Sequence, residues 1–135
     1  MILVDSNIAM YLVGADEDMR HAAQAAVMAA HDTGSVLVTD AEVYQEVLHR
    51  YTAIGRPEAI RPCVEVLDRL TARVLPIDRV VVTGAIEALA VNARLSARDA
   101  VHVAVARAHG IDRILSFDRG FDDVDGVRRL DDVAR

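Results

Sequence analysis

The chain begins M-I-L-V-D-S-N over residues 1–7, an apolar run that leads directly into an acid and two small polar residues. Ile2–Val4 has no polar position, which is typical of a strand buried on both faces of a parallel sheet. In open sheets of this kind the ligand site lies outside the carboxyl ends of the strands. We therefore expect the buried strand to hold Asp5 at a functional edge.

Apolar runs and helical segments alternate along the rest of the chain. Further strands are predicted at residues 36–38, 73–77 and 114–116, with a short fifth at 127–130. Helices are predicted at residues 5–13, 18–31, 39–54, 58–71, 79–92 and 96–109. This alternation predicts an α/β fold in which helices cover both faces of a central parallel sheet.

Composition narrows the class of protein. The 135 residues are expected to form a single domain, 1–135, whose core is aliphatic because 53% of residues are hydrophobic but only 4% are aromatic. We expect no signal peptide, because the apolar run at the N-terminus lacks a basic flank and ends at Asp5, and no membrane span, because no apolar run is long enough. With Cys63 as the only cysteine, a cytoplasmic location is expected. The net charge of −6 disfavours non-specific binding to polyanions.

Several acids fall where this sheet edge is predicted. Asp5 and Asp118 follow predicted strands, Asp99 lies one turn into a helix, and Glu42 and Glu46 lie on another helix. Carboxylates brought within a few ångströms repel one another strongly, so such a cluster needs a cation. All-oxygen ligation suits Mg²⁺ or Mn²⁺. The sequence therefore predicts a metal site at this edge.

Some of these acids also have a local explanation. Ser96 and Asp99 fit a capping box, in which Ser96 caps the helix and Asp99 reaches back to it. Thr39 and Glu42 fit a second capping box, which leaves Glu46 unexplained. Glu46 is therefore the preferred member of the cluster, with Glu42 as the alternative.

Four motifs in this order resemble the pattern of PIN-domain nucleases. They are ILVDSN, V-x-x-E at residues 43–46, S-x-x-D-A at 96–100 and S-F-D-R-G-F at 116–121. The match covers nearly the whole chain, and its length and spacing are similar to those of VapC toxins from bacterial toxin–antitoxin pairs. Residues 104–118 are especially similar to the corresponding stretch of that family. The resemblance implies the strand order 3-2-1-4-5, which sets the first and fourth strands side by side.

The resemblance also implies roles for individual residues. Four carboxylates match the quartet that binds one or two divalent ions: Asp5, Glu46, Asp99 and Asp118. Three polar residues are accessory candidates: Asn7, Ser116 and Asp122. The implied activity is Mg²⁺-dependent (or Mn²⁺-dependent) hydrolysis of RNA phosphodiesters by metal-activated water, with Asp99 or Asp118 accepting the proton.

Other basic and histidine side chains lie near these motifs. Arg94, Arg98 and Arg119 are candidates for contacts with RNA phosphates, although they equally fit solvated surface positions. His102 follows Asp99 by three residues, but no second ligand at zinc-site spacing accompanies it, so we predict a partly buried, hydrogen-bonded histidine.

The resemblance implies two protein partners. One is a cognate VapB-type antitoxin, whose C-terminal segment would lie across helices near residues 9–54 and insert an Arg into the acidic site. The other is a second copy of the chain in a homodimer. The alternative function is a catalytically silent PIN-like module that binds metal or RNA. Phosphatases of the haloacid-dehalogenase type and receiver domains are disfavoured, because both need a Lys and the chain has none.

Overall fold

A computed structural model describes residues 1–131 of the chain. Its five strands form one sheet in the order β3-β2-β1-β4-β5, and every pairing is parallel. The bounds are β1 Ile2–Val4, β2 Leu37–Asp40, β3 Val74–Leu75, β4 Arg113–Leu115 and β5 Arg128–Leu130. The predicted parallel sheet and its strand order are confirmed. Residues 132–135, the end of the predicted single domain, lie outside the described residues.

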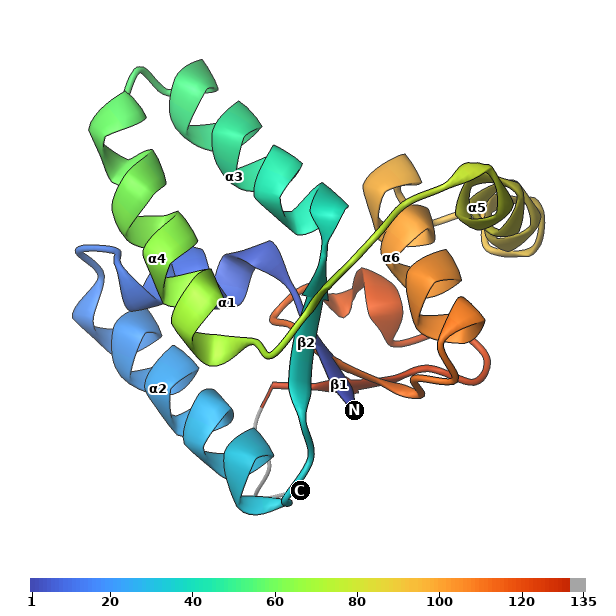
Figure 1. Ribbon diagram of the computed structural model, residues 1–135, viewed down its shortest axis with the longest axis horizontal. Coiled ribbons are helices and arrows are strands. Elements are labelled where there is room, and N and C mark those ends of the chain that lie inside the picture. Colours follow the sequence, from blue (N-terminus) through green and yellow to red (C-terminus); the bar gives the residue numbers. More distant parts are fainter. Residues whose placement is uncertain (132–135) are drawn as a thin grey trace.

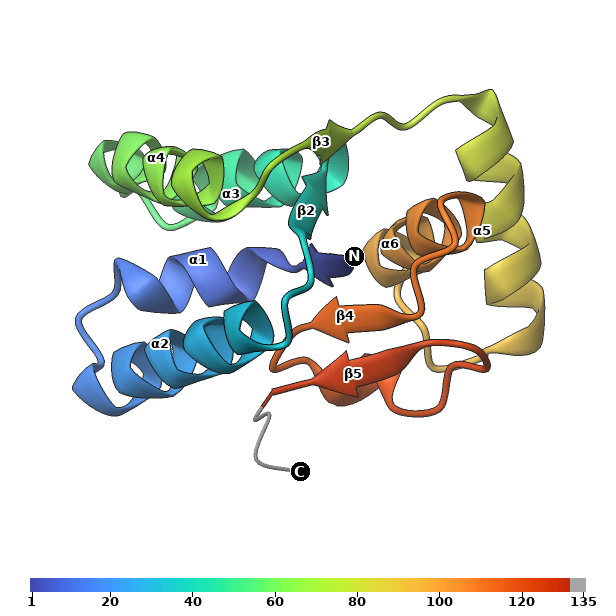
Figure 2. The same cartoon turned by 60° about the horizontal axis from the view of Figure 1, so that its bottom comes forward.

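Six α-helices surround the sheet. They are α1 Ser6–Leu12, α2 Glu17–Asp32, α3 Ala41–Ala53, α4 Ile60–Leu70, α5 Arg79–Val91 and α6 Ala97–Ala108, with short 3-10 turns η1 Pro57–Ala59 and η2 Arg119–Phe121. Figures 1 and 2 show α1–α4 gathered on one side of the sheet and α5–α6 on the other. Within residues 1–131 no helix has both the length and the apolar character that crossing a bilayer requires.

The central strands bury both of their faces, as the apolar run at the N-terminus predicts. Leu3 packs into the cluster formed with α5 and α6, whereas Ile2 and Val4 pack into the cluster formed with α1 and α2. All three side chains are at most 1% exposed. Alternate residues of β1 therefore anchor two separate apolar layers, and this fixes the position of Asp5 at the end of the strand.

One predicted helix start is wrong. Thr39 does not cap a helix but lies within β2, where its N–H donates to the Arg73 carbonyl at 3.0 Å and its hydroxyl to the Val4 carbonyl at 2.9 Å. Asp40 is the N-cap of α3, accepting the Val43 N–H at 3.0 Å. Because Thr39 pairs with Val74 of β3, strand β2 continues through Thr39, and α3 begins only after Asp40. The predicted Thr39–Glu42 capping box is therefore absent.

Candidate active site

Asp5 lies where β1 ends and α1 begins. It caps α1 by accepting the Ser6 N–H at 2.7 Å on Oδ1. The other oxygen, Oδ2, accepts the Ser116 hydroxyl at 2.6 Å and the Asn7 amide at 3.2 Å. The side chain is only 5% exposed. Three donors from two neighbouring strand ends thus hold a single buried carboxylate in one orientation.

Ser116 and Asn7 also connect Asp5 to the segment that follows β4. Asn7 donates to the Ser116 hydroxyl at 3.1 Å and accepts the Phe117 N–H at 3.2 Å. The Ser116 oxygen accepts the Asp118 N–H at 3.0 Å. The two predicted accessory residues therefore tie the position of Asp118 to that of Asp5.

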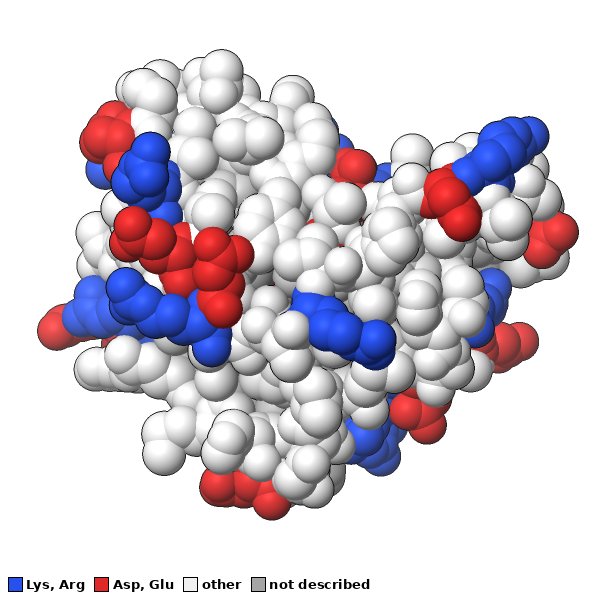
Figure 3. All heavy atoms as spheres, in the orientation of Figure 1, with Lys and Arg blue, Asp and Glu red and all other residues white. Residues whose placement is uncertain are grey.

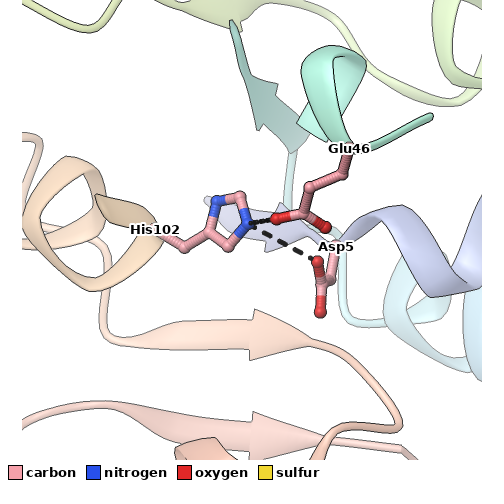
Figure 4. Close-up of side chains that lie close together, drawn as sticks. All are labelled: Asp5, Glu46 and His102. Carbon is pink, nitrogen blue, oxygen red and sulfur yellow. Dashed lines mark hydrogen bonds and ion pairs between the residues drawn. The ribbon is translucent and has the colours of Figure 1, made fainter. Parts of the chain in front are cut away.

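Glu46 extends from α3 toward Asp5. Its Oε1 lies 2.6 Å from His102 Nε2, and its Oε2 accepts the Ser6 hydroxyl at 2.5 Å. His102 Nε2 also lies 3.7 Å from Asp5 Oδ1. Figure 4 shows the imidazole of α6 pointing between the two carboxylates. One ligand-type atom from each of these three residues lies within 4.8 Å of the other two.

Asp40 contacts the opposite side of the same imidazole. Its Oδ2 lies 2.7 Å from His102 Nδ1, while its Oδ1 caps α3. Asp40 is fully buried and His102 is 1% exposed. His102 therefore joins carboxylates from α3 and from the end of β2 to α6, and is more deeply buried than the sequence predicts.

Burial, hydrogen bonds and charge together shift the pKa values of His102, Glu46 and Asp5. Burial alone would lower the pKa of His102, but its hydrogen bonds to Asp40 and Glu46 hold that pKa well above its usual value. Burial would raise the pKa of Glu46, yet the hydrogen bond and charge of His102 lower it overall. For Asp5, burial prevails over the more distant His102 and raises the pKa. The imidazole thus neutralises the buried acids unequally, with Glu46 favoured over Asp5.

Asp99 and Asp118 lie on the open side of the site. Together with Glu46, Ser96 and Arg98 they line a cleft of about 490 Å³. Ser96 caps α6 as predicted, accepting the Asp99 N–H at 3.1 Å. Within residues 1–131 neither of the two aspartates forms an ion pair with a basic side chain. Burial, followed by the charges of Asp118 and Asp5, raises the pKa of Asp99 to about 6.

The remaining predicted residues are placed around this cleft. Glu42 does not line it, and instead pairs with Arg98 at 3.9 Å. Asp122 also lies outside the cleft lining, because Arg129 holds it at 2.6 Å. Arg94 and Arg119 line a second, adjacent cavity. The structure therefore gathers the predicted quartet and one arginine, and separates Asp122 from them.

Two residues that complete the site were missed from the sequence. Asp40 was missed because Thr39, the residue before it, also belongs to a residue type that favours the N-cap, so the sequence predicted the helix to start at Thr39. Ser6 was not singled out, although it donates to Glu46 from the first turn of α1. The signal that could have identified Asp40 is an acid at the end of an apolar run, because Asp5 follows β1 in the same way.

The donor set fits a hard divalent cation. Asp5, Glu46, Asp99 and Asp118 offer carboxylate oxygens, the ligands that Mg²⁺ and Mn²⁺ prefer. The two aspartates at the cleft have no basic partner among the described residues, so a cation there would relieve their repulsion. His102 Nε2 is already bonded to Glu46, which leaves oxygen as the available ligand type.

Comparison with known proteins identifies the family. The family model described as PIN domain matches residues 2–127. The chain therefore belongs to the PIN-domain family, and the strand order and the acidic cluster at the strand ends agree with the resemblance found in the sequence.

Within this family the similarity is to VapC ribonucleases. The chain is 52% identical over 130 residues to ribonuclease VapC13 of Mycobacterium tuberculosis, covering 96% of this chain and 99% of that protein. It is 33% identical to ribonuclease VapC23 of the same species, covering 87% of this chain and 93% of the relative.

Solved structures share the fold at lower identity. The crystal structure of M. tuberculosis VapC20, a sarcin–ricin loop cleaving toxin, superposes with a TM-score of 0.72 at 22% identity, covering 90% of this chain and 93% of that chain. DNA-bound VapBC of Salmonella typhimurium gives a TM-score of 0.68 at 18% identity, covering 96% and 97%.

Proposed function

We propose that this chain is a Mg²⁺-dependent (or Mn²⁺-dependent) endoribonuclease, the toxin of a VapBC-type pair, acting as a single PIN domain in the cytoplasm. The observation that carries the proposal is the meeting of Glu46, Asp99 and Asp118 in one cleft beside the buried Asp5. The chain's 52% identity to a ribonuclease over nearly its full length supports the same reaction class.

The proposed metal ligands are Asp5, Asp99, Asp118 and Glu46. A bound divalent ion would lower the pKa of a water molecule and stabilise charge on the phosphate oxygens. The protein's own residues supply the geometry. Ser116 and Asn7 fix Asp5, Ser6 and His102 fix Glu46, and Ser96 anchors the first turn that carries Asp99. Ligands held by such partners need little reorganisation when they bind.

Proton transfer is assigned to the open side of the site. Asp99 and Asp118 line the cleft that RNA would enter, so either is positioned to accept the proton of the attacking water. In the metal-free protein, burial and the neighbouring acids raise the pKa of Asp99 to about 6, and a bound cation would lower this pKa because it favours the carboxylate. Neither aspartate needs to form a covalent bond with the substrate.

Phosphate binding is assigned to arginines around the cleft. Arg98 lines the acidic cleft itself, and Arg94 and Arg119 line the adjacent cavity. Figure 3 shows acidic and basic side chains in small neighbouring groups on the face it draws, with no broad basic area there. RNA binding is therefore proposed to depend on local arginines and the metal rather than on overall charge.

Two protein partners complete the proposal. Solved neighbours include VapBC complexes, which supports a cognate VapB-type antitoxin for this chain. On one face of α5 three apolar side chains are exposed to solvent, with Val82 40%, Ile86 57% and Leu89 39% exposed. An apolar helix face of this kind supports a homodimer.

The test is cleavage of total RNA by the purified protein with Mg²⁺, with Mn²⁺ and with EDTA, followed by mapping of the new ends. Asp5→Asn should abolish metal-dependent cleavage. The matched control is Glu65→Gln, which neutralises an exposed acid on α4 that only pairs weakly with Arg69 at 3.9 Å. Cleavage that survives EDTA or Asp5→Asn would contradict the proposal. RNA that is bound but never cut would favour the catalytically silent module.

A further inference from the structure

A second cavity of about 540 Å³ adjoins the acidic cleft. One wall is the segment that joins α5 to α6, and the other is the turn that follows Asp118. The lining residues used below are Val91, Arg94, Leu95, Arg119, Gly120 and Asp123. Both segments run directly into the acidic site, since Ser96 follows the first wall and Asp118 precedes the second.

Gly120 is the boundary between the cavity and the acids. A Cβ atom built on Gly120 would lie 3.1 Å from Asp118 Oδ1 and 3.3 Å from Asp99 Oδ2. A side chain at this position would crowd both carboxylates, which would have to shift by a few tenths of an ångström. A molecule that contacts Gly120 from the cavity is therefore separated from Asp99 and Asp118, two proposed metal ligands, only by this glycine.

The cavity combines the groups that recognise a nucleotide. Val91, which is 77% exposed, and the buried Leu95 give the cavity an apolar wall against which a base can pack. Arg94 and Arg119 form no ion pair within residues 1–131, so both guanidinium groups are available for phosphate. Asp123 is exposed and adds a carboxylate, which accepts hydrogen bonds from the amino groups of bases.

We propose that this cavity is a nucleotide subsite, which holds the base next to the scissile phosphate and selects bases that carry an exocyclic amino group. The substrate class rests on the proposed ribonuclease function. The occupant follows from the two guanidinium groups of Arg94 and Arg119, which are complementary to a phosphate although the chain as a whole is acidic, and from continuity with the acidic cleft across Gly120. The base packs against Val91 and Leu95, its amino group donates to Asp123, and its phosphate contacts Arg119.

The binding test uses mononucleotides and no metal. The wild-type protein in EDTA is titrated with 5′-GMP, 5′-UMP, ribose 5-phosphate and inorganic phosphate, and amide shifts are followed by NMR. We expect saturable shifts at Ala93, Leu95 and Gly120, with 5′-GMP binding at least ~3-fold more tightly than 5′-UMP and ~10-fold more tightly than ribose 5-phosphate. Equal binding of phosphate alone, or shifts confined to other surfaces, would overturn the proposal.

Variants separate the base contact from the phosphate contact. Asp123→Asn should abolish the preference for 5′-GMP over 5′-UMP, whereas Arg119→Ala should weaken both nucleotides alike. Arg128→Ala is the matched control, because it removes an exposed guanidinium on β5 that does not line this cavity. Concentration-dependent shifts at this surface without nucleotide would identify a second copy of the chain as the occupant, and would also overturn the proposal.

The outcome is distinguishable from failure of the ribonuclease proposal. Asp5→Asn should lose cleavage yet bind 5′-GMP as the wild type does in EDTA. If the protein cuts no RNA but binds nucleotides here, the subsite stands and the ribonuclease proposal fails. If Asp123→Asn leaves both nucleotide preference and the bases found at mapped cleavage sites unchanged, the subsite fails and the ribonuclease proposal stands.

Discussion

The acidic site has two halves that differ in how their charge is compensated. In the buried half, Asp5, Asp40 and Glu46 surround the imidazole of His102, and no buried side-chain polar atom within residues 1–131 lacks a hydrogen-bond partner. In the open half, Asp99 and Asp118 face the cleft without a basic partner in that range. Asp5 links the halves, because its charge contributes to the raised pKa of Asp99.

The difference indicates a division of labour. A neutralised, hydrogen-bonded half can keep its geometry in the absence of metal, since its carboxylates are already paired. The open half retains repulsion that only an added cation, or a proton, can relieve. We therefore expect substitutions of His102 and Asp40 to affect mainly stability, and those of Asp99 and Asp118 to affect mainly metal binding and cleavage. Asp5 belongs to both halves, so its substitution should also abolish cleavage.

The largest effect is expected from His102→Ala. Removing the imidazole leaves the buried Asp40 and the half-buried Glu46 without their partner, which should cost about 3–5 kcal/mol in the free energy of unfolding. Because the folded state raises the pKa of His102, its contribution is fully present below the unfolded pKa of about 6.5 and is lost as pH rises through the folded pKa. Urea unfolding at pH 6 measures it.

His109→Ala is the matched control, since this histidine lies at the C-terminal end of the same helix and is exposed. It should change stability by less than ~0.5 kcal/mol. A cost for His102→Ala as small as that of the control would show that the imidazole does not hold the buried half together.

The next largest effect separates capping from catalysis at Asp99. Asp99→Asn should reduce metal-dependent cleavage by more than ~100-fold, because losing a ligand should exceed the 10–100-fold typical of losing a ligand's support. Ser96→Ala removes the cap and should cost about 1 kcal/mol in stability with cleavage nearly unchanged. Cleavage rates and urea unfolding of both variants decide the matter. Equal, small losses of cleavage in the two would assign Asp99 to capping alone.

A smaller effect is expected on the pH dependence of stability. The pKa of Asp99 is about 6 in the folded metal-free protein and near 3.8 ordinarily, so the folded state binds this proton more tightly. Its contribution is therefore fully present below pH 3.8 and is lost as pH rises through about 6. Asp99→Asn should stabilise the metal-free protein at pH 8 and give no such gain at pH 4.

Thermal unfolding in EDTA at the two pH values measures this difference. Glu65→Gln is again the control, and should change the melting temperature by the same small amount at both. A variant Asp99→Asn that is destabilised at pH 8 would mean that the open half carries no repulsion to relieve.

The fold was predictable because local and tertiary preferences agree. The apolar run of β1 predicted a strand buried on both faces, and Ile2, Leu3 and Val4 are indeed packed into two opposite layers. The start of α3 was not predictable in the same way. Thr39 and Asp40 are both capping residue types, and only the pairing of Thr39 with Val74 on β3 extends the strand through Asp40.

The sequence motifs predicted the four acids of the site, but not the side chains that hold these acids in place. The four acids of the quartet follow strand ends or early helical turns, which sequence patterns reveal. The contact between Asp40 and His102 joins residues 62 positions apart, and no local pattern records it. Asp122 was misplaced for a similar reason, since its partner Arg129 comes from β5.

The most direct test of this division is a calorimetric titration of Mn²⁺ into the metal-free wild type, Asp99→Asn and the Glu65→Gln control. We predict saturable binding to the wild type and the control, an affinity that rises between pH 5 and pH 7 as Asp99 loses its proton at about pH 6, and at least a ~10-fold weaker affinity for Asp99→Asn. Unchanged binding to Asp99→Asn would contradict the account, because it would show that the cation binds without Asp99, at the group of Asp5, Glu46 and His102 alone.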